Sequence, residues 1–136
     1  MSLSSLFKSL GAPFVNTSRW GAVRGDDGAV FLRVWQDEIK KIGDFPCCRV
    51  TANSRYAHSK DAGWLERLGH VSLVREGAKC FLVVAIAKDR NAVPRVVKDF
   101  LDGAVIEGTE ITEFDGDTWI RLGRRIPVGE LAVPAV

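Results

Sequence analysis

The sequence predicts an α+β fold, in which a mostly antiparallel, twisted sheet of about six strands carries an N-terminal helix and a central helix. Three observations lead to this prediction. Apolar residues recur at helical spacing in two segments, 2–10 and 59–76, and β-prone runs occupy most of the remaining chain. No repeat, low-complexity tract or linker divides the 136 residues. Because this length is typical of one domain, we expect a single domain over residues 1–136, with a loosely ordered tail over 129–136.

The first half of the chain begins with a helix and continues with strands. The helix at 2–10 carries one apolar stripe: Leu3, Leu6, Phe7 and Leu10. Ser2 is suited to cap it. Two β-prone runs, 19–24 and 29–35, flank a Gly-Asp-Asp-Gly turn and therefore predict a hairpin. Residues 47–52 predict a third strand.

A second helix is expected over residues 59–76, where the spacing of apolar residues changes to that of a helix. Its buried face is expected to comprise Trp64, Leu65, Leu68, Val71 and Val74. Gly69 is a candidate interruption of this helix, and Gly77 a stop signal. Trp64 and Trp119 both fall at the apolar period of their segments, so both are expected in the core.

The second half is dominated by strands. Residues 79–88 form an apolar run between two lysines, which predicts a central strand covered on both sides. A short helix beginning at Pro94 is expected over 94–101. Two further runs, 111–114 and 118–122, flank an Asp-Gly-Asp turn and predict a second hairpin, with an additional edge strand at 124–128.

Composition gives information about compartment and partners. The formal net charge of +2 is too small to identify a polyanion-binding protein by bulk charge. The longest apolar run covers residues 80–87, far short of the roughly 20 residues of a membrane helix, and the N-terminus does not resemble a signal peptide. Three cysteines without a CxxC motif, and only two histidines, predict neither a structural zinc site nor another cofactor. We expect a cytoplasmic protein without a membrane partner.

The polar segment 53–60 is the first candidate binding site. It combines a guanidinium, a phenol, an imidazole and an ammonium group between a strand and a helix: Arg55, Tyr56, His58 and Lys60. Helix N-termini present free backbone N–H groups that attract anions such as phosphate, and arginine and tyrosine can stack on a base or another flat ligand. The alternative is a surface loop that only caps the following helix.

Two tryptophans of the first hairpin are the second candidate. Trp20 and Trp35 could pack against each other as a cross-strand pair, which would make them structural. Alternatively, they could form the wall of a pocket for a flat ligand. Arg19, next to Trp20, would then add a positive charge.

One pattern resembles that of an enzyme. Asp26 or Asp27, followed by Glu38-Ile39-Lys40, resembles the D…ExK motif of metal-dependent nucleases, and the expected element order is similar to the core of that family. The resemblance implies two carboxylates on one Mg²⁺ and a lysine beside the attacking water. However, Asp27 lies in the expected hairpin turn and Glu38 beyond the far end of the next strand, roughly 30 Å or more away along an extended chain. The expected third strand offers no carboxylate either, so we expect no metal site.

A cysteine nucleophile is the other catalytic alternative. Cys48 with His58 is the combination to test, since Cys80 falls in a buried-looking strand where thiols are inert.

No motif defines an activity, and the function therefore remains unknown at this stage. The leading hypothesis is a non-enzymatic binding domain for nucleic acid or for a small phosphate-bearing or aromatic ligand. One alternative is a protein-interaction or homo-oligomerising module, for instance a homodimer that uses the helix at 2–10 and an exposed sheet edge. The other is a nuclease-like or cysteine hydrolase enzyme.

Overall fold

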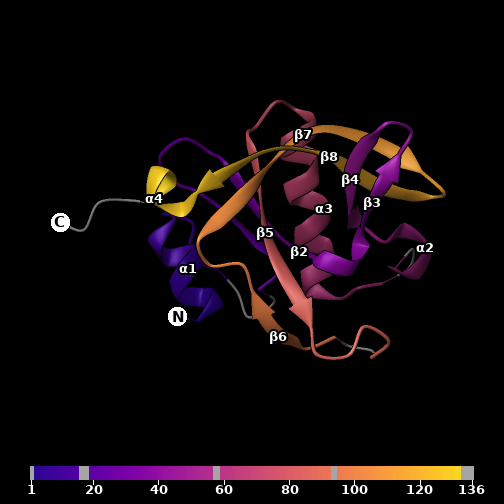
Figure 1. Ribbon diagram of the computed structural model, residues 1–136, viewed down its shortest axis with the longest axis horizontal. Helices are drawn as coiled ribbons and strands as arrows, with labels where there is room; N and C mark the ends of the chain where they lie inside the picture. Colours follow the sequence, from indigo (N-terminus) through magenta and orange to yellow (C-terminus); the bar gives the residue numbers. More distant parts are fainter. Residues whose placement is uncertain (1, 16–18, 57–58, 93–94, 133–136) are drawn as a thin grey trace.

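The computed structural model describes residues 2–15, 19–56, 59–92 and 95–132, and it contains one open, mostly antiparallel sheet with helices packed on it (Figure 1). The strand order is β1-β2-β5-β7-β8-β4-β3, and β6 pairs with β5 outside this path. The α+β class is therefore confirmed. The sheet has eight strands, two more than the expected number of about six.

The elements follow the chain in this order: α1 (Leu3–Ser9), β1 (Gly21–Val23), β2 (Val30–Trp35), a 3-10 turn (Gln36–Glu38), β3 (Ile39–Ile42), β4 (Phe45–Thr51), α2 (Asn53–Tyr56), α3 (Ala62–Arg75), β5 (Cys80–Ala87), β6 (Val97–Phe100), β7 (Ala104–Phe114), β8 (Asp117–Pro127) and α4 (Val128–Leu131).

One face of the sheet is covered by α1, as the stripe in residues 2–10 predicts. The Ser2 hydroxyl accepts the N–H of Ser5 at 3.1 Å and caps the helix. Leu6, Phe7 and Leu10 are completely buried and pack in a cluster with residues of β2, β5, β7 and β8. Figure 1 shows α4 at the same end of the molecule as α1, and two of its residues pack on the same cluster. The apolar stripe of α1 is therefore buried within its own chain.

The opposite face of the sheet is covered by α3, which runs through the middle of the molecule (Figure 1). The helix is continuous through Gly69. Trp64 and Val71 are buried and Val74 packs against the core cluster, as expected, but the placement of Leu65 and Leu68 in the core is wrong. Leu65 and Leu68 are 53% and 38% exposed, whereas Arg67 and His70 are buried. The buried face of α3 is thus rotated toward Arg67.

Two segments differ from the sequence expectation. Residues 97–100 form strand β6 on the edge of β5, and the helix expected at 94–101 is wrong. Phe100 packs there against the α1 cluster, so tertiary packing overrides the weak local signal for a helix. The segment Ile39–Ile42 forms strand β3, which pairs with β4 across a turn in which Gly43 has a φ of 62°. Its residues follow the order Ile-Lys-Lys-Ile, so apolar and polar side chains do not alternate and the sequence gives no strand signal there.

The structure confirms the expected central strand and second hairpin but not the separate edge strand at 124–128. β5 pairs with β2, β6 and β7, as expected of a central strand. β7 and β8 form the second hairpin around Asp115 and Gly116, whose positive φ values of 53° and 81° suit a tight turn. The segment 124–127 is the end of β8 rather than a separate strand, and the expected tail begins with α4. No helix among the described residues is both long enough and apolar enough to cross a bilayer.

Arg67 joins the two ends of the sheet. Its guanidinium donates to the carbonyl oxygens of Trp20 at 2.7 Å, Arg33 at 2.6 Å and Val50 at 2.7 Å. Strand β1 begins at Gly21, which pairs with Leu32 of β2. The carbonyl of Arg33 lies one residue past this pair. The Val50 carbonyl lies in an irregularity of the β4–β8 ladder, between Arg49 and Thr51. Arg67 therefore connects β2 to β4 through its hydrogen bonds to their backbone carbonyls.

Replacement of Arg67 tests this role. Arg67→Met leaves the carbonyls of Arg33 and Val50 without this donor, and we expect it to lower the free energy of unfolding by about 3 kcal/mol. The measurement is urea unfolding followed by circular dichroism. The control is Arg75→Met on the same helix, which removes an exposed pair with Glu113 and should cost less than about 1 kcal/mol. Equal losses in the two variants would contradict the role of Arg67.

Candidate ligand-binding site

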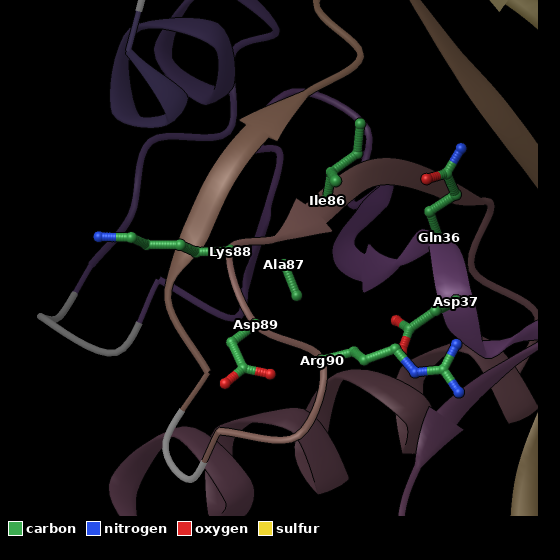
Figure 2. A pocket seen from close by; sticks show the side chains of 7 residues that line it. All are labelled: Gln36, Asp37, Ile86, Ala87, Lys88, Asp89 and Arg90. Carbon is green, nitrogen blue, oxygen red and sulfur yellow. The ribbon is translucent and has the colours of Figure 1, made fainter.

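A pocket lies at the carboxyl ends of β2 and β5, which run parallel. It has a volume of about 410 Å³. Its lining comes from the segments that leave the two strands: Gln36 and Asp37 after β2, and Ile86, Ala87, Lys88, Asp89 and Arg90 at the end of β5 (Figure 2). Ligands of open sheets with parallel strands commonly bind at this edge, because the outgoing loops provide polar groups there.

Arginine and tryptophan side chains alternate beside this pocket. The guanidinium carbon of Arg33 lies 4.7 Å from the ring centroid of Trp35 and 5.9 Å from that of Trp20. Arg95 lies 5.4 Å from the Trp35 ring, and Arg67 lies 5.8 Å from the Trp20 ring. We call this series, Arg67–Trp20–Arg33–Trp35–Arg95, the arginine–tryptophan ladder. Each cation is attracted by the negative face of a neighbouring ring.

Trp20 is held in the ladder by α2 and α3. Its ring meets Tyr56 edge-on at a centroid distance of 5.6 Å, and Tyr56 stacks on Trp64 at 5.1 Å. The ring also packs directly on Gly63, where an added Cβ would lie 2.4 Å from its Nε1. Trp20, Trp35 and Tyr56 are only partly buried, so each keeps part of its ring accessible to solvent.

Three carboxylates neutralise two of the nearby arginines. Asp37 accepts two hydrogen bonds from Arg95, at 2.7 and 2.9 Å. Glu38 accepts from Arg49 at 2.8 Å and also lies 3.5 Å from Arg95. Asp117 accepts from Arg49 at 3.1 Å. The acidic groups beside the ladder are therefore engaged by its outer arginine and by Arg49.

Arg33 and Arg67 make no ion pair with any carboxylate that the structure describes. Burial lowers the pKa of Arg33 to about 10, and Tyr56 and Glu38 offset only part of this effect. Burial also lowers the pKa of Arg67 to about 10, and repulsion by Arg33 adds to it. Both guanidinium groups stay charged at neutral pH. The Nε atoms of both are buried without a hydrogen-bond partner. Two positive charges thus share the Trp20 ring without a counter-ion.

The structure brings together three of the residues singled out in the sequence. The Arg33 guanidinium lies over the rings of Trp20 and Trp35, and Tyr56 contacts the Trp20 ring edge-on. The two tryptophans do not lie directly opposite each other across the hairpin. Arg33 donates its backbone N–H to the Trp20 carbonyl at 2.9 Å, so Arg33 lies opposite Trp20 and its side chain contacts both rings.

The other sequence candidates contribute less to this geometry. Arg19, with a φ of 56°, and Lys60 are exposed. His58 and the side chain of Arg55 lie outside the described part of the structure.

The principal residue of the site, Arg33, was not among these candidates. A signal for it was present, because Arg33 and Trp35 alternate with buried residues on one face of β2. Arg67 also carried a signal, since it follows Trp64 by three residues and precedes Val71 by four on the helix.

The D…ExK arrangement does not form. Asp27 pairs with Arg24 at 2.8 Å near the start of β2, whereas Glu38 follows the far end of that strand. The antiparallel pairing of β1 and β2 confirms the hairpin that separates them. Lys40 lies over the rings of Phe114 and Trp119, at 4.7 and 4.9 Å. Among the described residues, no three His, Cys, Asp or Glu side chains group in a way that could hold a metal ion.

Comparisons of the chain with protein-family models, with curated proteins and with solved structures found no match.

The cysteines are arranged as packing residues. Cys47, Cys48 and Cys80 are all buried and unpaired with one another. Burial raises the pKa of Cys80 to about 12 and that of Cys48 still further. Both thiols are therefore protonated at neutral pH, and a protonated thiol is a poor nucleophile.

Thiol titration tests this conclusion. With an aromatic disulfide reagent at pH 8, we expect the native protein to react slowly, because the thiols are buried and protonated. In denaturant all three cysteines should react rapidly. Fast stoichiometric labelling of one cysteine in the native protein would contradict this result and favour the cysteine-hydrolase alternative.

Two glycines of α3 test the packing of the ladder. Gly63→Ala places a methyl group against the Trp20 ring, so we expect altered near-ultraviolet circular dichroism and a loss of about 1–3 kcal/mol. Gly69→Ala meets open space and should instead stabilise the helix by about 0.5–1 kcal/mol. If both variants were equally stable, Trp20 would not depend on Gly63.

Proposed function

We propose that this protein is a non-enzymatic binding domain for a flat aromatic ligand that carries an anionic group, as a nucleotide does. The observation that carries the proposal is Arg33, a partly buried guanidinium that lies between two tryptophan rings without a carboxylate partner in the described structure. A buried charge is costly unless an opposite charge compensates it. A ligand anion would supply this compensation.

The local charge balance supports an anionic ligand. Four arginines carry the positive charge here: Arg33, Arg67 and Arg95 within the ladder, and Arg49 beside it. Three carboxylates oppose them: Asp37, Glu38 and Asp117. The difference leaves one net positive charge, and the three carboxylates form their ion pairs with Arg49 and Arg95. Arginine is also the residue best suited to bind phosphate or carboxylate with two parallel hydrogen bonds.

The surrounding rings support a flat ligand. Trp20, Trp35 and Tyr56 are partly exposed, and aromatic rings of this kind stack on bases with little dependence on base identity. The pocket of about 410 Å³ begins directly after Trp35, at Gln36 and Asp37, and has the volume of a small-molecule site. A nucleotide combines the two chemical features, a planar base and a phosphate group.

Tryptophan fluorescence measures this binding directly. Titration with adenosine 5′-monophosphate should quench the emission, because the base stacks on Trp20 or Trp35. Arg33→Met should weaken the affinity at least about 10-fold, as expected for the loss of a charged hydrogen bond. Arg33→Lys should restore part of it, since the charge is kept and the planar fork is lost.

Matched controls separate this site from general charge effects. Arg125→Met removes an exposed arginine of β8, and we expect unchanged affinity. The titration is repeated with short single-stranded oligonucleotides of increasing length. If the partner is a nucleic acid, the affinity should rise with oligonucleotide length; if it is a free nucleotide, the affinity should not rise. Absence of quenching by either probe at low salt, with a folded protein, would refute the proposal.

A further inference from the structure

Half of the sheet has one face that neither α1 nor α3 covers. On β4 and β8, Cys48 and Ile120 belong to the cluster that packs under α3. Because side chains alternate along a strand, their neighbours Arg49 and Trp119, which pair across the two strands, lie on the opposite face. Figure 1 shows α1 at the other end of the molecule from β3 and β4. We call this surface of β3, β4, β7 and β8 the open face; its cationic and aromatic residues are Lys40, Phe45, Arg49, Phe114, Trp119 and Arg121.

Exposed aromatic rings and cations lie together on the open face. Phe45 and Phe114 are 45% and 41% exposed. The guanidinium carbon of Arg121 lies 3.4 Å from the ring centroid of Phe45. The Nζ atom of Lys40 lies 4.7 Å from the centroid of Phe114 and 4.9 Å from that of Trp119. Among the described residues, neither Lys40 nor Arg121 forms an ion pair with a carboxylate, so both can pair with an anion from outside the chain.

The open face is hollowed beside Phe45. The hollow has a volume of about 220 Å³, and Phe45 of β4, Arg121 of β8 and Thr112 of β7 contribute to its lining. One acid, Glu110, also lines it. The cations Lys40 and Arg121 outnumber this acid, so the local charge favours an anionic occupant over a cationic one.

The open face continues from the arginine–tryptophan ladder. Glu38 lies 3.5 Å from Arg95 of the ladder and accepts a hydrogen bond from Arg49 at 2.8 Å. Arg49 in turn lies opposite Trp119 in the β4–β8 ladder. From Arg49 to Phe45, β4 extends for four residues, or about 13 Å. Cations and aromatic rings therefore form one series that begins at the ladder and ends at Phe45.

We propose that the ligand of this domain is a single-stranded nucleic acid, with one base at the ladder and further nucleotides along the open face toward Phe45. This inference rests on the proposed function, because the ladder holds the first nucleotide. Single strands bind where bases can stack on aromatic rings while phosphates pair with cations, and the open face offers both side by side. The bases of a duplex are stacked on one another, so exposed rings favour a single strand.

Fluorescence anisotropy with a labelled eight-residue oligoadenylate tests the open face, and adenosine 5′-monophosphate serves as the probe of the ladder alone. The octamer should bind about 10-fold more tightly than the mononucleotide, or better, because it occupies both surfaces. Phe45→Ala should weaken the octamer about 5-fold or more through the loss of one stacked base, and it should leave the affinity for the mononucleotide unchanged. Phe45 is 45% exposed, so the variant is expected to fold.

Two neighbouring lysines of β3 provide a matched pair of variants. Lys40 lies on the open face, whereas Lys41 is exposed and, by alternation, points to the other side of the sheet. Lys40→Gln should reduce the slope of log Kd against log salt for the octamer by about 0.7, as expected for one lost phosphate contact. Lys41→Gln changes the net charge equally and should leave the slope unchanged.

The outcomes separate this inference from the proposed function. If the mononucleotide binds but the octamer binds no more tightly, the open face has no part in binding and this inference fails alone. The same conclusion follows if Phe45→Ala leaves the octamer affinity unchanged, or if the two lysine variants have equal effects. If neither probe binds the folded protein at low salt, both proposals fail.

Discussion

The carbonyl oxygens of Trp20, Arg33 and Val50 come from two ends of one open sheet, and a single guanidinium group binds all three. Arg67 provides these hydrogen bonds from the buried face of α3. A buried arginine without a carboxylate is costly, and here three charged hydrogen bonds to backbone carbonyls compensate part of that cost. Through this one side chain, α3 is connected to the segment before β1, to β2 and to β4.

The same group also links the architecture to the candidate ligand site. Arg67 contacts the backbone of Trp20 and Arg33 and lies beside the Trp20 ring, so it positions the inner part of the ladder. Arg33 in turn contributes to the lowered pKa of Arg67 by repulsion between the two positive charges. A bound anion would relieve the repulsion between the two arginines. Binding of the proposed anion at Arg33 would therefore stabilise the fold as well as occupy the site.

The helix α3 has an unusual distribution of polarity. Its buried face carries Arg67 and His70, whereas its exposed face carries leucines. This distribution explains why periodicity alone selected Leu65 and Leu68 for the core. Both leucines are exposed because the face of α3 that carries Arg67 is turned toward the sheet, where Arg67 donates to three backbone carbonyls.

Local patterns in the sequence determined the element types wherever spacing and turn residues agreed. Three features were predicted in this way: the capped apolar stripe of α1, the Asp-Gly turns of the two hairpins and the apolar run of β5. Each depends on residues that are close together in the chain, so the sequence alone shows it. The sequence likewise indicated Trp20, Trp35 and Tyr56 as aromatic candidates. Only the tertiary structure placed Arg33 between the tryptophans and Arg67 among three carbonyls, because those partners are far apart in the chain and their unpaired backbone groups exist only once the strands have met.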